Sequence, residues 1–185
     1  QQAGLGGGSM NASTLINFLM IKKIIKIEKD ELAKLAKLIG SDVILGINAK
    51  NSILSSNGKI TQYKKKFRLY TLIVKPNFGC STKYIFSKVK SFSKAKLNLP
   101  KHTMFNKYYL KNLNNDLEVV AFKKYPKLKN IKSFLSSIPN TIFVRMSGSG
   151  SSIVAYFHSK KACSIALKKF KRKFNSYWCI ASKTI

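Results

Sequence analysis

A glycine-rich segment directly before a helical pattern constrains this chain most strongly. Four glycines and a serine precede apolar residues at helical spacing, in the order Gly4, Leu5, Gly6, Gly7, Gly8 and Ser9. Glycine permits a positive φ and lets backbone N–H groups approach an anion, and a helix that begins there adds the positive end of its dipole. The segment therefore predicts a phosphate-binding loop that leads into a helix, whose first turn Ser9 can cap.

This segment differs from the two common phosphate-binding motifs. A Walker motif would end in Gly-Lys-Ser/Thr, and a dinucleotide-binding G-x-G-x-x-G would follow an apolar strand. Residues 1–8 alone would also suit a flexible linker or an expression tag. The continuation through Asn11 and Ala12 into a periodic helix favours phosphate binding over a linker.

The segment resembles the second signature motif of the GHMP superfamily of small-molecule kinases. Its GGGS-x-N-A form is similar to that of the 4-diphosphocytidyl-2-C-methylerythritol kinases, rather than to the Gly-Ser-Ser-Ala form of homoserine or mevalonate kinases. Four later stretches resemble the same family in the same order and together span most of the chain: residues 40–43, 78–82, 115–118 and 146–152.

The resemblance implies an α+β protein with the two-domain GHMP kinase fold. Residues 1–75 would form the C-terminal part of a ribosomal-protein-like, ATP-binding N-terminal domain, and residues 76–185 the α+β C-terminal domain. In the family, a catalytic lysine and much of the cytidine pocket precede the glycine segment. We therefore expect this chain to be N-terminally incomplete and to have little or no kinase activity by itself.

The implied reaction is ATP-dependent phosphorylation of the 2-hydroxyl of 4-diphosphocytidyl-2-C-methyl-D-erythritol, in non-mevalonate isoprenoid biosynthesis. ATP would enter with Mg²⁺, and its phosphates would contact Gly4, Leu5, Gly6, Gly7, Gly8, Ser9 and Asn11. A carboxylate beside the bound hydroxyl can accept its proton as it attacks the γ-phosphate, and Asp42 is in register with that family position. A plain cap of the turn after Gly40 is the alternative for Asp42. The family continues from this aspartate into Val-Pro, whereas this chain has Val43-Ile44-Leu45-Gly46.

A second glycine–serine loop lies between two expected strands, 142–146 and 153–158. It resembles the third signature of the family, which approaches the phosphates and substrate from the other domain, and its candidate contacts are Ser147, Gly148, Ser149, Gly150 and Ser151. A flexible backbone between strands suits close approach to a ligand. A simple strand-connecting turn is the alternative.

The other patterns predict alternating helices and strands. We expect helices from residues 9 and 30, a hairpin over 48–63 with Asn57-Gly58 at its turn, a strand over 69–74, a domain boundary near Lys75, a short helix capped by Ser81-Thr82, helices over 104–113, 116–125, 128–138 and 162–174, and a strand over 177–181. Helices with an antiparallel sheet make the second domain α+β.

Acidic residues are so few that their positions carry information. Glu28, Asp30 and Glu31 stand where a helix begins, so capping explains them. The other three, Asp42, Asp116 and Glu118, fall inside the family-like stretches. We interpret residues 115–118 as a helix start with a structural role.

The formal net charge of +29 is typical of a nucleic-acid-binding protein. However, only Arg68, Arg145 and Arg172 among the 35 basic residues are arginine, the residue that binds phosphate with planar, bidentate geometry. Lysines at solvated positions in an A/T-rich genome explain the charge more simply, so we expect no specific nucleic-acid partner. A basic RNA-binding α/β protein is the alternative from another class, and another GHMP small-molecule kinase the alternative within the class.

No pattern of disulfides or metal ligands is present in the sequence. Cys80, Cys163 and Cys179 are odd in number and far apart, and His102 and His158 lack a third ligand at metal spacing. No run of eighteen apolar residues occurs either. We expect buried thiols, no metal site built from His or Cys, a cytoplasmic location, no membrane partner, and a nucleotide-linked polyol as the substrate.

Overall fold

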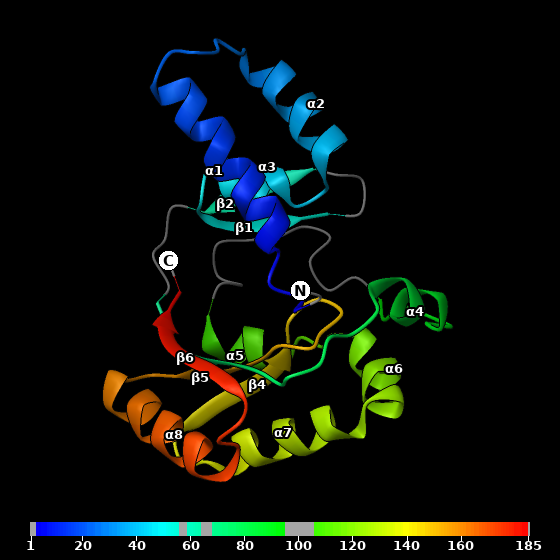
Figure 1. Cartoon of the computed structure of the whole chain (residues 1–185), viewed down its shortest axis with the longest axis vertical. Coiled ribbons are helices and arrows are strands. Elements are labelled where there is room, and N and C mark those ends of the chain that lie inside the picture. Colours follow the sequence, from blue (N-terminus) through cyan, green and yellow to red (C-terminus); the bar gives the residue numbers. More distant parts are fainter. Residues whose placement is uncertain (1–2, 56–58, 64–67, 95–105, 185) are drawn as a thin grey trace. The chain divides into compact units, whose positions relative to one another are not determined.

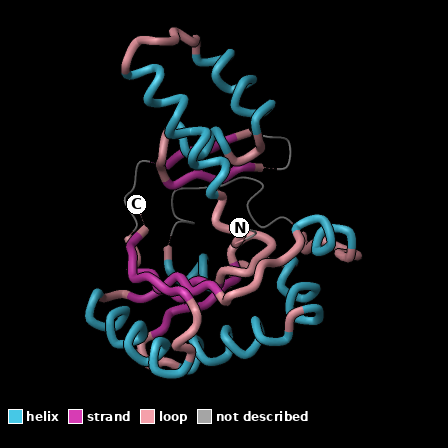
Figure 2. Tube along the Cα trace, in the orientation of Figure 1, coloured by secondary structure: helices cyan, strands magenta, loops and turns pink. Residues whose placement is uncertain are grey.

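The computed structural model describes residues 3–55, 59–63, 68–94 and 106–184, and within them the chain forms two compact units (Figures 1 and 2). The smaller unit begins at Gly6 and extends through the hairpin that ends at Tyr63. The larger unit combines residues 3–5 with the chain from residue 68 onward.

The smaller unit packs helices against a short hairpin. Its elements are α1 (Gly7–Ile21), α2 (Lys29–Ile39), α3 (Val43–Ile47), β1 (Asn51–Leu54) and β2 (Ile60–Tyr63). Strands β1 and β2 pair antiparallel, which confirms the expected hairpin, although its Asn57-Gly58 turn lies outside the described residues. A small core of Ile16, Leu32, Ala36 and Val43 joins the three helices.

The larger unit contains a four-stranded antiparallel sheet in the order β4-β5-β3-β6. Its strands are β3 (Tyr70–Lys75), β4 (Thr141–Met146), β5 (Ile153–Phe157) and β6 (Trp178–Lys183), and its helices are α4 (Thr82–Ser87), α5 (Lys107–Lys111), α6 (Leu117–Lys124), α7 (Pro126–Ser137) and α8 (Lys160–Lys173). Figure 1 shows α7 and α8 side by side on one face of this sheet. The expected α+β architecture with an antiparallel sheet is confirmed.

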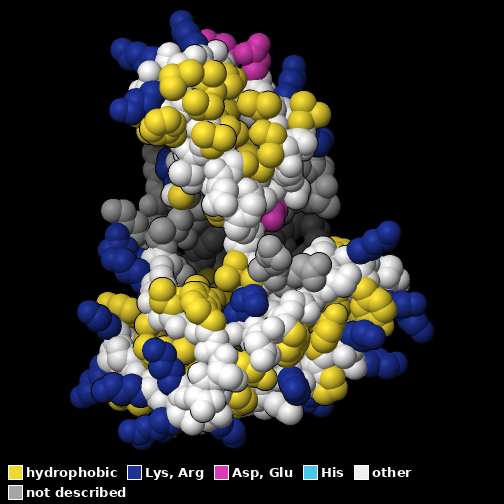
Figure 3. Space-filling model, viewed as in Figure 1, with side chains coloured by type: hydrophobic (Ala, Val, Ile, Leu, Met, Phe, Trp, Pro, Cys, Tyr) yellow, Lys and Arg dark blue, Asp and Glu magenta, His cyan; other side chains and the backbone are white. Residues whose placement is uncertain are grey.

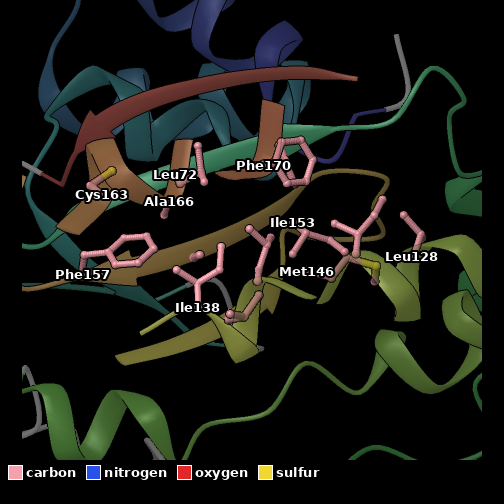
Figure 4. Packing of buried hydrophobic residues seen from close by; sticks show 14 of the residues in the cluster. Leu72, Leu128, Ile138, Met146, Ile153, Phe157, Cys163, Ala166 and Phe170 are labelled. Carbon is pink, nitrogen blue, oxygen red and sulfur yellow. The ribbon is translucent and has the colours of Figure 1, made fainter. Parts of the chain in front are cut away.

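The core of the larger unit lies between the sheet and these two helices (Figure 4). Helix α8 buries Ala162, Cys163, Ala166 and Phe170, which recur at helical spacing, while its lysines stay exposed. Burial of this apolar face against β3, β5 and β6 holds a lysine-rich helix in place.

Strand β3 belongs to the sheet of the larger unit, because it pairs on one side with β5 and on the other with β6. The boundary that we expected near Lys75 would assign this strand to the first domain. The compact units instead separate between the end of β2 and the beginning of β3. Pairing with residues that follow 79 or more positions later decides this, and local sequence patterns do not report it. The domain limits 1–75 and 76–185 otherwise stay a prediction.

Basic side chains are spread over the visible face of the larger unit instead of forming one stripe (Figure 3). The cysteines of the described chain are free thiols; Cys80 and Cys163 are buried. In the same part of the chain, no helix has the length and apolar character needed to cross a membrane.

Candidate functional site

The glycine segment, residues 4–9, ends in the first turn of α1. Gly6 is the N-cap residue and adopts a left-handed φ of 64°, and Gly4 adopts 68°. The helix therefore begins at Gly7, two residues before the expected start, because a glycine makes the left-handed turn into it without strain. The predicted cap by Ser9 is wrong: Ser9 lies inside the first turn, and no side chain caps the helix.

The start of α1 is open on the side of its glycines. A Cβ atom built on Gly6, Gly7 or Gly8 would meet no described atom within 4 Å. The first intrahelical hydrogen bond runs from the N–H of Met10 to the carbonyl oxygen of Gly6, so the N–H groups before it have no partner in the helix. N–H groups without a helical partner at a helix start favour an anion, which agrees with the phosphate loop that the sequence predicts.

Helices α1 and α3 are fixed together by hydrogen bonds from α1. The hydroxyl of Ser13 donates to the carbonyl oxygen of Val43 at 2.6 Å. The same hydroxyl lies 2.7 Å from the carbonyl oxygen of Ser9. One turn further along, the amide of Asn17 donates to the carbonyl oxygen of Ile47 at 3.1 Å. The start of α3 is thereby fixed against the first half of α1.

Asp42 stands immediately before α3, at its N-cap position, and is exposed. Its carboxylate accepts no capping hydrogen bond from the first turn, and within the described chain it accepts one hydrogen bond, from the hydroxyl of Ser41 at 3.4 Å. The turn that carries it lies near the glycine segment, because a Cβ built on Gly40 would be 3.8 Å from Oγ of Ser9. The geometry thus leaves the carboxylate available for a partner other than the helix that it precedes.

We predict that Gly46→Ala destabilises the smaller unit. A Cβ at this position would lie 2.5 Å from Oγ and 2.7 Å from Cβ of Ser13, inside the contact that holds α1 to α3. Overpacking of this kind costs about 1–3 kcal/mol. Urea unfolding monitored by circular dichroism measures the loss. Gly8→Ala is the matched control, since its Cβ has open space, and it should be neutral or stabilising; equal stability of Gly46→Ala and the parent chain would contradict the close packing.

The serine loop, residues 147–152, joins β4 to β5, as the sequence predicts. Gly148 and Gly150 adopt left-handed φ values of 51° and 85°. The side chains of Ser149 and Ser151 are buried, and three hydroxyls of the loop have protein partners: Ser147 donates to the carbonyl oxygen of Gly4 (2.6 Å), Ser149 pairs with the hydroxyl of Thr82 (2.8 Å), and Ser151 donates to the carbonyl oxygen of Phe78 (2.6 Å). The loop is therefore a folded element fixed at three points.

The beginning of the glycine segment lies on this loop, within the larger unit. Besides the Ser147–Gly4 hydrogen bond, the N–H of Ser152 donates to the carbonyl oxygen of Ala3 at 3.0 Å. A Cβ on Gly4 would collide with the carbonyl oxygen of Ser147 and would lie 2.8 Å from that of Gly150. Two predicted motifs more than 140 residues apart in the sequence are thus in direct backbone contact.

Two segments support the serine loop from outside. Ser81 caps α4 by accepting a hydrogen bond from the N–H of Tyr84 at 3.2 Å, which confirms its expected role. Its neighbour Thr82 contacts Ser149, which we did not predict. The second segment is the start of α6, where Asn115 and Glu118 make hydrogen bonds to the backbone of residues 146–148.

Residues 115–118 do form the expected helix start, since α6 begins at Leu117 with Asp116 as the N-cap. The sequence did not predict the contacts of Asn115 and Glu118 with the backbone of residues 146–148. The scarcity of acidic residues was the available signal, because a glutamate among so many lysines is conspicuous at a partly buried position.

Burial shifts the pKa of two groups near the loop. The thiol of Cys80 has its pKa raised to about 11 by burial, so it stays neutral at physiological pH. Burial lowers the pKa of Arg145, which the nearby Tyr156 and Glu118 partly offset, and its guanidinium donates to the carbonyl oxygens of Leu110 and Leu113. Arg145 thereby joins β4 to the end of α5.

Metal ligands do not cluster in the described part of the chain: no three His, Cys, Asp or Glu side chains there come close enough to share an ion. Ser9, in the first turn of α1, carries a hydroxyl oxygen. Oxygen donors are the kind that Mg²⁺ prefers, and this ion usually keeps several waters and binds substrate phosphates.

Comparison with known proteins identifies the family. Residues 95–176 match the family described as GHMP kinases C terminal. The whole chain is 63% identical to the 4-diphosphocytidyl-2-C-methyl-D-erythritol kinase of Pelagibacter ubique (strain HTCC1062) and covers 66% of that protein. It is 31% identical over 100% of its length to the kinase of the same name from Clostridium tetani, of which it covers 67%.

The fold agrees with these relatives. A crystal structure of 4-(cytidine 5′-diphospho)-2C-methyl-D-erythritol kinase matches all of the chain with a TM-score of 0.79 at 21% identity, and the chain covers 68% of it. The chain spans about two thirds of the curated relatives that it matches. The expected GHMP kinase fold is confirmed, and the likeness of the first part to a ribosomal-protein domain stays a prediction. The chain belongs to the 4-diphosphocytidyl-2-C-methyl-D-erythritol kinase family of the GHMP kinases.

Proposed function

We propose that this chain carries the phosphate-binding and proton-accepting parts of a kinase that transfers the γ-phosphoryl group of ATP to the 2-hydroxyl of 4-diphosphocytidyl-2-C-methyl-D-erythritol. The observation that carries this proposal is the arrangement within the smaller unit: an exposed carboxylate, Asp42, on a turn that lies near the start of α1. The names of the relatives supply the substrate.

Phosphoryl transfer requires the phosphates to be held and the attacking hydroxyl to be oriented. The N–H groups at the start of α1 would bind the phosphate oxygens of ATP, with Asn11 and the hydroxyl of Ser9 beside them. Asp42 would accept the proton of the substrate hydroxyl as that oxygen bonds to the γ-phosphorus and the bond to the β–γ bridging oxygen breaks, which releases ADP. Mg²⁺ would arrive with the nucleotide and offset phosphate charge, and the Ser9 hydroxyl would supply an oxygen ligand.

The serine loop would contribute through its backbone, because the hydroxyls of Ser147, Ser149 and Ser151 are used to hold the loop in shape. We propose that residues 147–151 bind the phosphates or the substrate of this reaction. The partner class is a small nucleotide-linked polyol, and we propose a cytoplasmic enzyme with no specific nucleic-acid partner.

A substitution that adds a negative charge at the proposed phosphate site tests phosphate binding. Gly7→Asp puts a carboxylate into open space at the start of α1, where it should stabilise the helix yet repel a triphosphate. Titration with a fluorescent ATP analogue should show affinity at least about tenfold weaker than in the parent chain, with an unchanged or higher melting temperature. Gly7→Asn is the neutral control of the same size.

Two results would contradict the proposal. One is equal nucleotide affinity in Gly7→Asp and Gly7→Asn. The other is displacement of the bound analogue by RNA, with a steep dependence on salt, and no displacement by ATP. The RNA-binding alternative predicts this behaviour.

A further inference from the structure

The start of α6 contacts three backbone groups of residues 146–148. Asn115 donates through Nδ2 to the carbonyl oxygens of Met146 at 3.0 Å and Gly148 at 2.8 Å. Glu118 accepts through Oε1 a hydrogen bond from the N–H of Met146 at 2.7 Å. Side chains one turn apart thus fix the strand end and the first glycine of the serine loop.

We propose that Asn115 and Glu118 are positioning residues for the nucleotide, which act by holding the serine loop so that the loop holds Gly4. The inference rests on the proposed role of the glycine segment in phosphate binding. It assigns a function to the start of α6 beyond that of beginning a helix.

Asn115 is suited to this task because both ends of its amide are used. Oδ1 accepts a hydrogen bond from the N–H of Leu117 at 3.1 Å, so the side chain is fixed to its own helix. Nδ2 is then directed at the two loop carbonyl oxygens. An aspartate has the same shape and could still accept the hydrogen bond from Leu117. Its second carboxylate oxygen, however, would replace the donor Nδ2 and face the two loop carbonyl oxygens.

Glu118 is held from two sides. Its side chain is only 13% exposed, and Oε2 pairs with Nζ of Lys132 at 2.5 Å. A carboxylate this well covered is costly unless it is paired and hydrogen-bonded, and here the lysine of α7 and the N–H of Met146 satisfy it. The contact therefore ties α7, α6 and the end of β4 together.

The serine loop passes this restraint to the glycine segment. Ser147 lies between the two carbonyl groups that Asn115 binds, and its hydroxyl donates to the carbonyl oxygen of Gly4. The N–H of Ser152, at the other end of the loop, donates to Ala3. Gly4 is two residues before Gly6, the N-cap of α1, so a loop that shifts removes the anchor of the phosphate-binding segment.

The experiment compares Asn115→Asp with Asp116→Asn. Asp116 is in the same turn, but its carboxylate accepts hydrogen bonds from the N–H and hydroxyl of Ser93, both at 2.9 Å, and we find no contact of it with the serine loop among the described residues. Hydrogen exchange of the Ser152 amide reports whether residues 3–4 stay on the loop. Binding of the fluorescent ATP analogue reports the consequence for the nucleotide.

We expect Asn115→Asp to accelerate exchange at Ser152 and to weaken nucleotide binding roughly tenfold, and Asp116→Asn to change neither. Glu118→Gln keeps the shape of the side chain and an acceptor for Met146, and should give a smaller effect in the same direction. In a chimaera in which this chain replaces the aligned segment of the Pelagibacter ubique relative, Asn115→Asp should raise KM for ATP more than it lowers kcat.

The outcomes separate this inference from the proposed function. If the parent chain binds no nucleotide, the proposed function fails, while exchange at Ser152 still decides whether Asn115 holds the loop on residues 3–4. Weaker nucleotide binding with unchanged exchange at Ser152 would overturn the inference. So would equal effects of Asn115→Asp and Asp116→Asn, since these would reflect a general loss of helix stability.

Discussion

Asp42→Asn should lower turnover by a factor of roughly 10²–10⁴ and leave nucleotide affinity almost unchanged. Asparagine has the size of aspartate but cannot take up the proton of the attacking hydroxyl. The exposed side chain accepts one hydrogen bond in the described structure, from Ser41, so its replacement should cost the fold little. Steady-state kinetics of the chimaera, with analogue titration of the chain itself, separates the two quantities.

The matched control for Asp42 is Asp30→Asn. Asp30 is also an exposed carboxylate of the smaller unit, but it lies in the first turn of α2, where it complements the helix dipole. It should affect stability by a few tenths of a kcal/mol and turnover not at all. Equal turnover in Asp42→Asn and Asp30→Asn would remove Asp42 from the role of general base.

Gly4→Ala should detach the glycine segment from the serine loop and abolish measurable nucleotide binding. The new Cβ would collide with the carbonyl oxygen of Ser147 and crowd that of Gly150, both of which are backbone atoms that cannot turn aside as a side chain would. The φ of 68° adds strain for any residue with a Cβ. Analogue titration and exchange at the Ser152 amide measure the effect, and the larger unit should also lose about 1–3 kcal/mol of stability.

Gly6→Ala separates the two causes of that effect. Gly6 also has a positive φ, of 64°, but a Cβ there would meet no described atom within 4 Å. Gly6→Ala should therefore show the conformational strain without the collision and should leave exchange at Ser152 unchanged. If the two variants behaved alike at Ser152, the contact between Gly4 and the serine loop would not be what holds the segment.

Local patterns predicted much of the fold. The hairpin of β1 and β2, the serine loop between β4 and β5, and the cap of α4 by Ser81 each depend on residues close together in the sequence, and each is confirmed. The cap by Ser9 failed for a local reason as well, since the left-handed conformation of Gly6 starts α1 earlier. From the sequence, Gly6 or Ser9 could have been the N-cap residue, and only the backbone angles of the structure distinguish the two.

Long-range pairing accounts for what the sequence did not predict. The assignment of β3 depends on strands that follow much later, and the anchor of Gly4 comes from Ser147, 143 residues further along the chain. The contacts of Asn115 and Glu118 with residues 146–148 are of the same kind. The family resemblance supplied the order of the motifs, and the physical contacts between them had to come from the structure.

The close approach of Ser13 and Gly46 makes the two positions depend on each other in evolution. A larger residue at 46 would be tolerated only after residue 13 had become smaller, and that change would discard the hydroxyl that reaches the carbonyl oxygen of Val43. Either single change is harmful before the other occurs. Descendants of this sequence should therefore retain the pair or exchange both members together, and a survey of close relatives would reveal such paired exchange as covariation between the two positions.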